Sequence, residues 1–553
     1  MQRNGEDFEV TISDASPGQR YSLVLEDARE RPDPVSRSQP LGVHGPSEIV
    51  DPNAFQWTDQ NWTGLPLSQL IIYELHTGTF TPEGTFEAIV AKLPYLKDLG
   101  ITAIEVMPIA EFPGSRNWGY DGVDFYAPQS SYGGPAGLKK LVDECHRAGL
   151  AVILDVVYNH AGPEGNYLAE FGPYFTDHYR TPWGPAINYD GPGSDGVRRF
   201  VIENALYWLT EYHIDGLRLD AIHGIYDFGA VHLLAELADR FHAQARELGR
   251  QAWLIAESDL NDVRILQPRD VGGYGLDAQW HDEFHHAMLS LLTKADRGFL
   301  ASFGTLADIQ KVLREGFVYD GIYSPYRQRR FGNSSKDIPG EKFVVFLQNH
   351  DQVANTSQGH RLSDLVSQDQ LKLAVTLLFC APYIPLLLMG EEFADTAEFL
   401  YFTSHLDPGL GKAVTEGRRR EYAAFRMHDR FFDPQAVETF ELSKIHWLMV
   451  DDPGHRAIRD LYRKLIARRK DWPCLSNCRK DLTEVRIDER LQLLKMERGD
   501  PAGSQAELWC NFSADSAAYQ APAGDGWEIA LQTAPAPAGK IAGHSAILYL
   551  RKG

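Results

Sequence analysis

Short apolar runs alternate with amphipathic stretches between about residue 70 and residue 392. Several runs are apolar without a break, as expected of parallel strands that are buried on both faces. The runs occupy residues 71–76, 101–109, 150–160, 214–223, 252–258, 277–283, 342–351 and 384–392. The stretches between them, such as 86–100 and 138–149, have helical periodicity. Eight successive strand–helix units predict an α/β fold, a closed (β/α)8 TIM barrel.

An open, doubly wound sheet is the alternative arrangement of alternating strands and helices. Such a sheet carries a glycine-rich phosphate-binding turn after its first strand. Here the first run continues into HTGTFTPEG (76–84), which lacks that fingerprint. The pattern therefore favours the closed barrel.

The two ends of the chain have a different pattern. Residues 1–66 contain two short strand-like runs, 8–12 and 21–25, and a linker rich in Pro, Ser and Gly. Two strands alone make no stable module, so either they dock on the main domain or the module lacks its first strands. We expect the barrel over 67–470, with a lid insertion at about 159–197, and a small C-terminal β-domain over 471–553.

Charge and cysteine content narrow the range of partners. The chain has 54 Lys and Arg against 76 Asp and Glu, a net charge of −22. This charge disfavours binding to nucleic acid or anionic membranes. Five sparse cysteines indicate reduced thiols and not a disulfide framework or a zinc site. The polar N-terminus is no signal peptide, and prolines break the apolar run 373–389, so a cytoplasmic protein is expected.

Polar residues stand at the carboxyl ends of most predicted strands, where TIM barrels keep their catalytic groups. They are Asp155, Asn159, His160, Arg218, Asp220, His223, Glu257, Asp282, Glu283, Asn349, His350 and Asp351. Crowded carboxylates cost free energy unless cations or chemistry offset it. The sequence therefore predicts an active site at this rim.

Three chemistries use such a ring: metal binding, proton abstraction beside a carbonyl, and glycoside cleavage. The histidines leave metal binding open. Glycoside cleavage needs two carboxyl groups, and Asp220 and Glu257 on adjoining strands would lie about 5–5.5 Å apart, the spacing of a retaining mechanism. Tyr120 and Trp183 lie in Gly-rich loops and are candidates for stacking on sugar rings.

Four segments then match a known pattern. DVVYNH (155–160), GLRLDAIH (216–223), LIAES (254–258) and QNHD (348–351) resemble, in order, the signature segments of the α-amylase family of glycoside hydrolases. The resemblance covers roughly residues 70–450. Within that family the chain is similar to the maltooligosyltrehalose trehalohydrolases, on the stretches 32–52, 73–86, 117–128, 278–287 and 349–362. This implies hydrolysis of the α-1,4-glucosidic bond next to a terminal trehalose unit, within trehalose biosynthesis from α-glucan.

The resemblance implies a full β-sandwich at the N-terminus, of which residues 1–66 would be a shortened, β-sandwich-like segment. It also implies roles for single residues. Asp220 would be the nucleophile, Glu257 the general acid and then base, and Asp351 the stabiliser of the transition state. The implied substrate contacts are Tyr120, His160, Arg218, His223, Asp282, Glu283, His285, His286, His350, Gln352 and Asn355. Ala354 and Thr356 depart from the Gly and Arg of the family pattern.

The resemblance implies no cofactor and no metal. The implied ligands are maltooligosyltrehalose and related α-glucans, and a maltooligosyltrehalose synthase is implied as the upstream enzyme. An α-glucan branching enzyme, or another amylase-type hydrolase, is the alternative. An inactive glucan-binding protein is a third reading, which the presence of Asp220, Glu257 and Asp351 disfavours.

Overall fold

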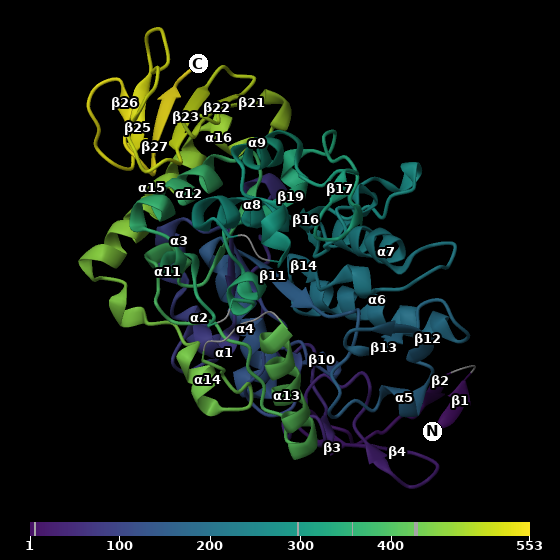
Figure 1. The fold of residues 1–553 in the computed structure, drawn as a ribbon. Helices are drawn as coiled ribbons and strands as arrows, with labels where there is room; N and C mark the ends of the chain where they lie inside the picture. The colour runs from purple at the N-terminus through teal and green to yellow at the C-terminus, as the bar shows by residue number, and fades with distance from the viewer. Residues whose placement is uncertain (5–6, 296–297, 357, 425–429) are drawn as a thin grey trace.

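The computed structural model describes residues 1–553 except 5–6, 296–297, 357 and 425–429, and its centre is a closed barrel of eight parallel strands. The strands are β7 (Ile72–Leu75), β8 (Ala103–Val106), β11 (Ala151–Val156), β14 (Gly216–Leu219), β15 (Trp253–Ala256), β16 (Ala278–Trp280), β19 (Phe343–Phe346) and β20 (Ile384–Leu388). Each pairs with its neighbours in parallel register, and β20 closes the ring on β7. The predicted TIM barrel is confirmed (Figure 1).

The strands are shorter than the apolar runs that predicted them. The run 277–283 contributes only three residues to the sheet, because α8 begins at Asp282. The polar residues at the ends of the runs therefore lie in loops or in first turns of helices at the carboxyl end of the barrel. At that position their side chains can contact one another.

Helices surround the barrel and bury their apolar faces against it. They include α3 (Leu93–Leu99), α4 (Gly134–Ala148), α6 (Ser194–Glu211), α7 (Leu233–Glu247), α8 (Asp282–Thr293), α9 (Leu306–Glu315), α12 (Gln368–Cys380) and α15 (Pro453–Asp471). Helix α4 ends where Gly149 adopts a φ of 79° and donates its N–H to the last turn, as its sequence predicted. None of the described helices is long and apolar enough to cross a membrane.

The N-terminal residues contain short paired strands. In the described part of 1–66 these are β1 (Gln2–Asn4) with β2 (Asp7–Glu9), β3 (Arg20–Tyr21) with β6 (Ser47–Glu48), and β4 (Leu23–Val24) with β5 (Glu30–Arg31). The strand expected over 8–12 ends at Glu9, and the one expected over 21–25 is divided at Ser22. The strands are shorter than predicted because each pair in this region joins only two or three residues of each strand.

A C-terminal antiparallel sheet completes the fold and lies at the yellow end of the ribbon (Figure 1). Its strand order is β21 (Thr483–Asp488), β22 (Leu493–Gly499), β23 (Gln505–Asn511), β27 (Ser545–Arg551) and β25 (Glu528–Gln532). A two-stranded sheet of β24 (Ala517–Ala518) and β26 (Lys540–Ile541) accompanies it. All five cysteines are buried free thiols, in agreement with the prediction.

Candidate active site

Arg218 stands at the centre of the polar ring. It lies on β14 in register with Asp155 of β11, and its side chain is fully buried. One guanidinium nitrogen, Nη1, lies 2.8 Å from carboxylate oxygens of both Asp155 and Asp220, and Nη2 lies 2.9 Å from Glu257. The guanidinium also covers the ring of Trp280 at 4.2 Å. A single cation thus gathers three carboxyl groups from three adjoining strands.

Asp220 is held from two sides. The Asn159 side-chain amide donates to its carboxylate at 2.6 Å, opposite the bond from Arg218. The next residue, Ala221, has a φ of 36°, a left-handed conformation that costs a residue with a Cβ about 1–3 kcal/mol. In that conformation the Ala221 N–H donates to Glu257 Oε2 at 2.7 Å. The strained backbone therefore fixes Glu257 beside Asp220.

A second chain of hydrogen bonds joins Tyr120 to the floor of the ring. Its hydroxyl donates to Asp155 at 2.7 Å and lies 2.8 Å from His350 Nε2. His350 Nδ1 lies 2.5 Å from Glu74 Oε1, and Asp351 lies 3.6 Å from the other ring nitrogen. Although burial lowers the pKa of His350, Asp351 and Glu74 raise it more, to about 9.

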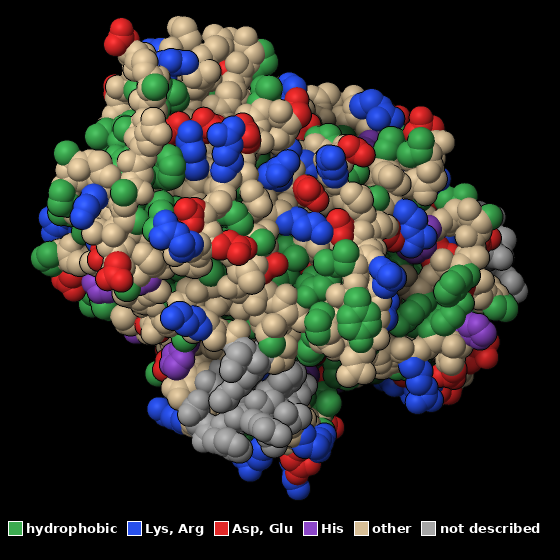
Figure 2. Space-filling model, turned by 45° about the horizontal axis from the view of Figure 1, so that its top comes forward, with side chains coloured by type: hydrophobic (Ala, Val, Ile, Leu, Met, Phe, Trp, Pro, Cys, Tyr) green, Lys and Arg blue, Asp and Glu red, His purple; other side chains and the backbone are tan. Residues whose placement is uncertain are grey.

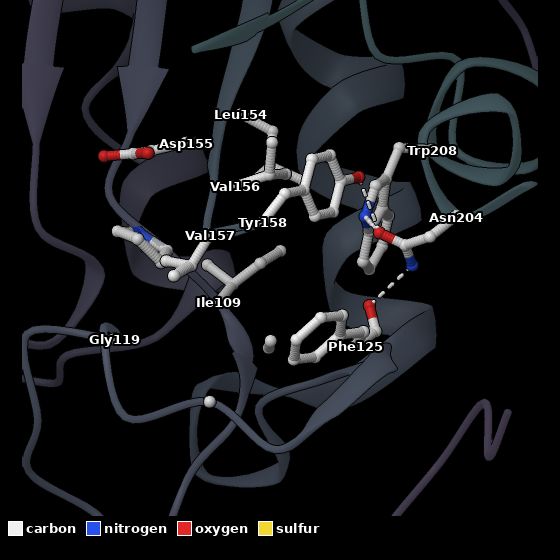
Figure 3. A pocket seen from close by; sticks show the side chains of 13 residues that line it. Ile109, Gly119, Phe125, Leu154, Asp155, Val156, Val157, Tyr158, Asn204 and Trp208 are labelled. Carbon is white, nitrogen blue, oxygen red and sulfur yellow. Dashed lines mark hydrogen bonds between the residues drawn. The ribbon is translucent and has the colours of Figure 1, made fainter. Parts of the chain in front are cut away.

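Asp155 belongs to the barrel interior. Burial raises its pKa to about 7; Asp220 adds to this effect and Arg218 opposes it. Figure 3 shows its carboxylate pointing away from Tyr158 and Asn204. Those two side chains share a 2.7 Å hydrogen bond on the helix side of β11. The alternation of the strand thus separates a polar interior face from a packed helix-side face, where a small cavity lies.

Trp183 lies over the rim at the turn between β12 (Phe175–Thr181) and β13 (Gly184–Ile187). Its ring stacks on His160 at 5.0 Å between centroids, with 12° between planes, and 47% of the residue is exposed. His160 Nε2 lies 3.0 Å from the Tyr120 carbonyl oxygen, and burial lowers the pKa of its ring. An exposed aromatic face therefore stands next to the buried ring.

Asp282 and Gln352 line the opposite side of the ring. Asp282 is the first residue of α8, and Gln352 Nε2 donates to it at 3.4 Å from α10 (His350–Ala354). Burial raises the pKa of Asp282 to about 8, with further increases from Glu257 and Asp351. This carboxyl group is thus held in its protonated form at neutral pH and can donate a hydrogen bond.

Not every candidate residue joins this ring. The Glu283 carboxylate accepts the N–H groups of Val318 and Tyr319, and His285 bonds the Leu347 carbonyl. Both contacts anchor α8 to its surroundings. The remaining candidates lie at the periphery: His223 in a 3-10 turn after β14, His286 against Phe299, and Asn355 exposed at the end of α10.

Of the two departures from the family pattern, Ala354 is buried and Thr356 makes local contacts. The Thr356 hydroxyl donates to the Val353 carbonyl and accepts from the His360 N–H, each at 2.7 Å. Thr356 thus stabilises the loop after α10 with its own backbone. An arginine at this position would project a charge where Thr356 makes only local bonds.

Two buried carboxyl groups below the ring were missed by the sequence analysis. Glu74 and Glu105 lie in register on β7 and β8. Burial raises the pKa of Glu105 far above its ordinary range, and Glu74 adds to that effect. Both interrupt apolar strand runs, and an acid inside a continuous apolar run is the signal that could have marked them. Among the described residues, no cluster of three or more His, Cys, Asp or Glu side chains is arranged to hold a metal ion.

Sequence comparisons place this site in a family. A family model described as alpha amylase, catalytic domain, matches residues 49–183. A malto-oligosyltrehalose trehalohydrolase of Saccharolobus solfataricus is 49% identical over 470 residues, which cover 85% of this chain and 81% of the relative. One from Rhizobium sp. is 46% identical and covers 88% and 83%.

The chain belongs to the malto-oligosyltrehalose trehalohydrolase family. A 1,4-alpha-glucan branching enzyme of Pseudoalteromonas atlantica is only 26% identical and covers 84% of this chain and 61% of its own. This branching enzyme, a member of the alternative class, is therefore less similar to the chain than the two trehalohydrolases. A crystal structure of a protein described as an alpha amylase from Salmonella typhimurium matches with a TM-score of 0.90 and 40% identity, over 98% of this chain and 92% of that one.

Proposed function

We propose that this protein hydrolyses the α-1,4-glucosidic bond next to the terminal trehalose unit of maltooligosyltrehalose. The products are trehalose and a shortened maltooligosaccharide. The observation that carries the proposal is the pairing of Asp220 and Glu257 through one buried guanidinium, at adjoining strand ends of the barrel. Family membership at 49% identity supports the choice of substrate.

In the first step the two carboxyl groups have different roles, one as nucleophile and one as acid. Asp220, which Arg218 and Asn159 orient, attacks the anomeric carbon of the glucose that precedes trehalose. Glu257 gives its proton to the glycosidic oxygen, the carbon–oxygen bond breaks, and trehalose leaves. Asp351 stabilises the positive charge that develops on the sugar ring. The glucan chain remains attached to Asp220 as an ester.

Water completes the reaction. Glu257, now ionised, takes a proton from a water molecule, whose oxygen attacks the same anomeric carbon. The ester bond to Asp220 breaks, and the maltooligosaccharide leaves with its anomeric configuration retained. Because the same carboxyl group acts first as acid and then as base, its fixed position beside Ala221 serves both steps.

Side chains around the ring bind the sugars. Tyr120, His160, Arg218 and His350 surround the sugar beside the cut, and Trp183 offers a stacking face. Asp282 and Gln352 face the sugar from α8 and α10, with Asp282 donating from its protonated form. His223, His286 and Asn355 contact more distant units, whereas Glu283 and His285 act indirectly by anchoring α8.

The wider setting follows from the chemistry of the substrate. A maltooligosyltrehalose synthase supplies the trehalose-capped glucan, and the protein acts in the cytoplasm. The division into 1–66, 67–470 and 471–553, with the lid at about 159–197, remains our proposal for its domains. The exposed stack of Trp183 on His160 supports the lid assignment.

Product analysis tests the proposal directly. The protein is incubated with maltooligosyltrehalose and, in parallel, with a maltooligosaccharide of the same length, and the products are separated by chromatography. Free trehalose from the first substrate, with little cutting of the second, is expected. Equal cutting of both indicates an amylase-type hydrolase, and branched products indicate a branching enzyme; either result overturns the proposed substrate.

A further inference from the structure

A groove of about 790 Å³ opens on the C-terminal sheet, on a domain separate from the barrel. Its volume lies within the range of small-ligand sites. Its floor is one face of the sheet, built from alternate residues of β22 and β23, with Arg551 of β27 beside them. The other face, with Leu494, Leu508 and Leu548, belongs to the main hydrophobic core. The groove side carries a smaller buried cluster that includes Leu493, Ile541 and Tyr549, and Leu493 also lines the groove.

Three half-buried aromatic residues line this groove: Trp509, Tyr519 and Trp527. Trp509 and Tyr519 meet edge to face at 5.5 Å, and the Tyr519 hydroxyl lies 2.5 Å from that of Tyr549. These contacts hold the Trp509 and Tyr519 rings in place while each residue stays only half-buried. Prearranged aromatic faces lose little conformational entropy when a ligand stacks on them.

The charges in the groove balance and already have partners. Its lining holds three cations, Arg486, Lys495 and Arg551, and three anions, Asp488, Glu497 and Glu507. Lys495 lies 2.9 Å from Glu507 and 3.0 Å from Glu497. Arg551 donates to Gln505, and its guanidinium lies 4.9 Å over Trp527. No cation is held apart for an anionic ligand, which distinguishes this groove from a phosphate or nucleic-acid site.

Figure 2 shows Lys and Arg side chains interspersed with Asp and Glu over one face of the molecule. Such mixing, in a chain of net charge −22, gives no general attraction for polyanions. Paired carboxylates, an amide and exposed aromatic rings are instead suited to a neutral ligand with many hydroxyl groups. The hydroxyls can share the hydrogen bonds of the ion pairs, and the rings can cover the apolar faces of the sugar.

We propose that the groove on the C-terminal sheet, lined by Trp509, Tyr519 and Trp527, is a second α-glucan-binding site, separate from the catalytic ring. The choice of an α-glucan rests on the function proposed above. A glucan held here raises the local concentration of chain ends near the barrel. The site therefore affects long glucan substrates and leaves short ones unaffected.

Native gel electrophoresis through amylopectin tests this proposal. All proteins carry Glu257→Gln, so that the polymer is not cut in the gel. We expect retardation of the parent, and an apparent dissociation constant about tenfold higher with Trp527→Ala. Ala518→Arg, which places a long side chain from an exposed position into the groove, is expected to act in the same way. Ile529→Ala, exposed on β25 outside the lining, is the matched control and keeps full retardation.

Rates complete the test. In the active chain, Trp527→Ala should leave kcat/KM for a short maltooligosyltrehalose unchanged and lower it severalfold for a long one. Undiminished retardation with both groove variants, or an unretarded parent, overturns the proposal. Altered oligomeric state with undiminished retardation assigns the groove to a second copy of the chain and also overturns it. If Trp527→Ala does not fold, Ala518→Arg decides.

A failure of the proposed catalytic function is recognised separately, because it appears as absent trehalose in the product analysis. The gel measures binding of the inactive protein and does not depend on that result.

Discussion

Two clusters of charged residues are buried at opposite ends of the barrel. The ring around Arg218 lies at the carboxyl ends of the strands. The other, here called the amino-end cluster, lies where β11 and β14 begin and consists of His146, Asp59, Asp215, His213 and Arg250. Both combine histidine, arginine and carboxylates in a buried setting. Composition alone would make either a candidate active site.

The amino-end cluster is internally complete. His146 lies 2.8 Å from Asp59 and 2.9 Å from Asp215, and all three side chains are at most 2% exposed. Asp215 also accepts the indole N–H of Trp62 and the backbone N–H of Val152. Hydrogen bonds from the two histidines hold the pKa of Asp59 well below its usual range, against the opposing effect of burial. The cluster ties the segment before the barrel to the starts of two strands.

The ring around Arg218 is crowded but open. Asp351 has a side-chain exposure of 38% and Glu257 of 18%, so both can meet a ligand. Burial raises the pKa values of Asp155 and Asp282 to about 7 and about 8, so both carboxyl groups are harder to ionise than an ordinary aspartic acid. The difference teaches that crowded charges mark a reactive site only where some of them stay accessible and incompletely paired.

The largest expected effect comes from Glu257→Gln. The amide keeps the shape of the side chain but cannot give up a proton, so turnover should fall by about four orders of magnitude. The free energy of unfolding should change by less than about 1 kcal/mol. Trehalose release and urea unfolding measure the two quantities, with Glu247→Gln, exposed at the end of α7, as control. If Glu257→Gln kept a tenth of the original turnover, Glu257 would not be the general acid and base.

The converse is expected at the amino end. His146→Ala removes the shared partner of two buried carboxylates and should lower the free energy of unfolding by about 3–5 kcal/mol. Turnover of the folded variant should stay within about twofold, because no group of the cluster reaches the substrate. Arg147→Ala, which changes the next residue on α4, is the control, because the Arg147 side chain is 68% exposed. If His146→Ala were stable but had lost turnover, the amino-end cluster would contribute to catalysis, and the two clusters would not differ in the way described here.

The sequence predicted the barrel because its strands are nearly continuous apolar runs. It predicted most of the ring because Asp220 and Glu257 follow such runs directly, and parallel strands bring their carboxyl ends together. The anchoring contacts of Glu283 and His285 escaped it. Both lie on the same helix as Asp282, and only the rotation of that helix decides which side chains face the ring around Arg218.

The amino-end cluster and the pair Glu74 and Glu105 also escaped the sequence analysis. His146 and Asp215 are 69 residues apart and meet only through the packing of α4 on the barrel. No local pattern encodes that contact. The two glutamates were overlooked because apolar neighbours on both sides made their strands appear uniformly apolar.

A smaller effect is expected from the pH dependence of His350. Its folded-state pKa of about 9 lies above the ordinary value of 6.5. Its stabilising contribution is therefore complete below about pH 6.5 and is lost as the pH rises through about 9. Relative to His350→Gln, the wild-type free energy of unfolding should fall by up to roughly 3 kcal/mol over that interval. Urea titrations across the interval measure it.

His178→Gln, which changes an exposed histidine, should show no such pH-dependent difference. A constant difference between wild type and His350→Gln across the same interval would mean that His350 remains neutral in the fold. The ring around Arg218 would then hold one positive charge fewer.

The smallest effect concerns two tryptophans that make the same contact at opposite ends of the barrel. Trp183 stacks on His160 at 5.0 Å and 12°, and Trp62 stacks on His146 at 4.8 Å and 14°. Trp62 also donates its indole N–H to a buried carboxylate, whereas 47% of Trp183 is exposed. We expect Trp183→Ala to raise KM about fivefold, near 1 kcal/mol of lost stacking, with kcat and stability little changed.

Trp62→Ala should do the reverse, lowering the free energy of unfolding and leaving KM unchanged. Steady-state kinetics and urea unfolding of both variants, with Trp183→Phe to restore a stacking face, separate the two roles. If Trp183→Ala lowered kcat and left KM unchanged, the ring would act by positioning His160 and not by holding a sugar. The tryptophan–histidine stack would then be structural at both ends of the barrel. Only the exposure of Asp351 and Glu257 would then distinguish the ring around Arg218 from the amino-end cluster.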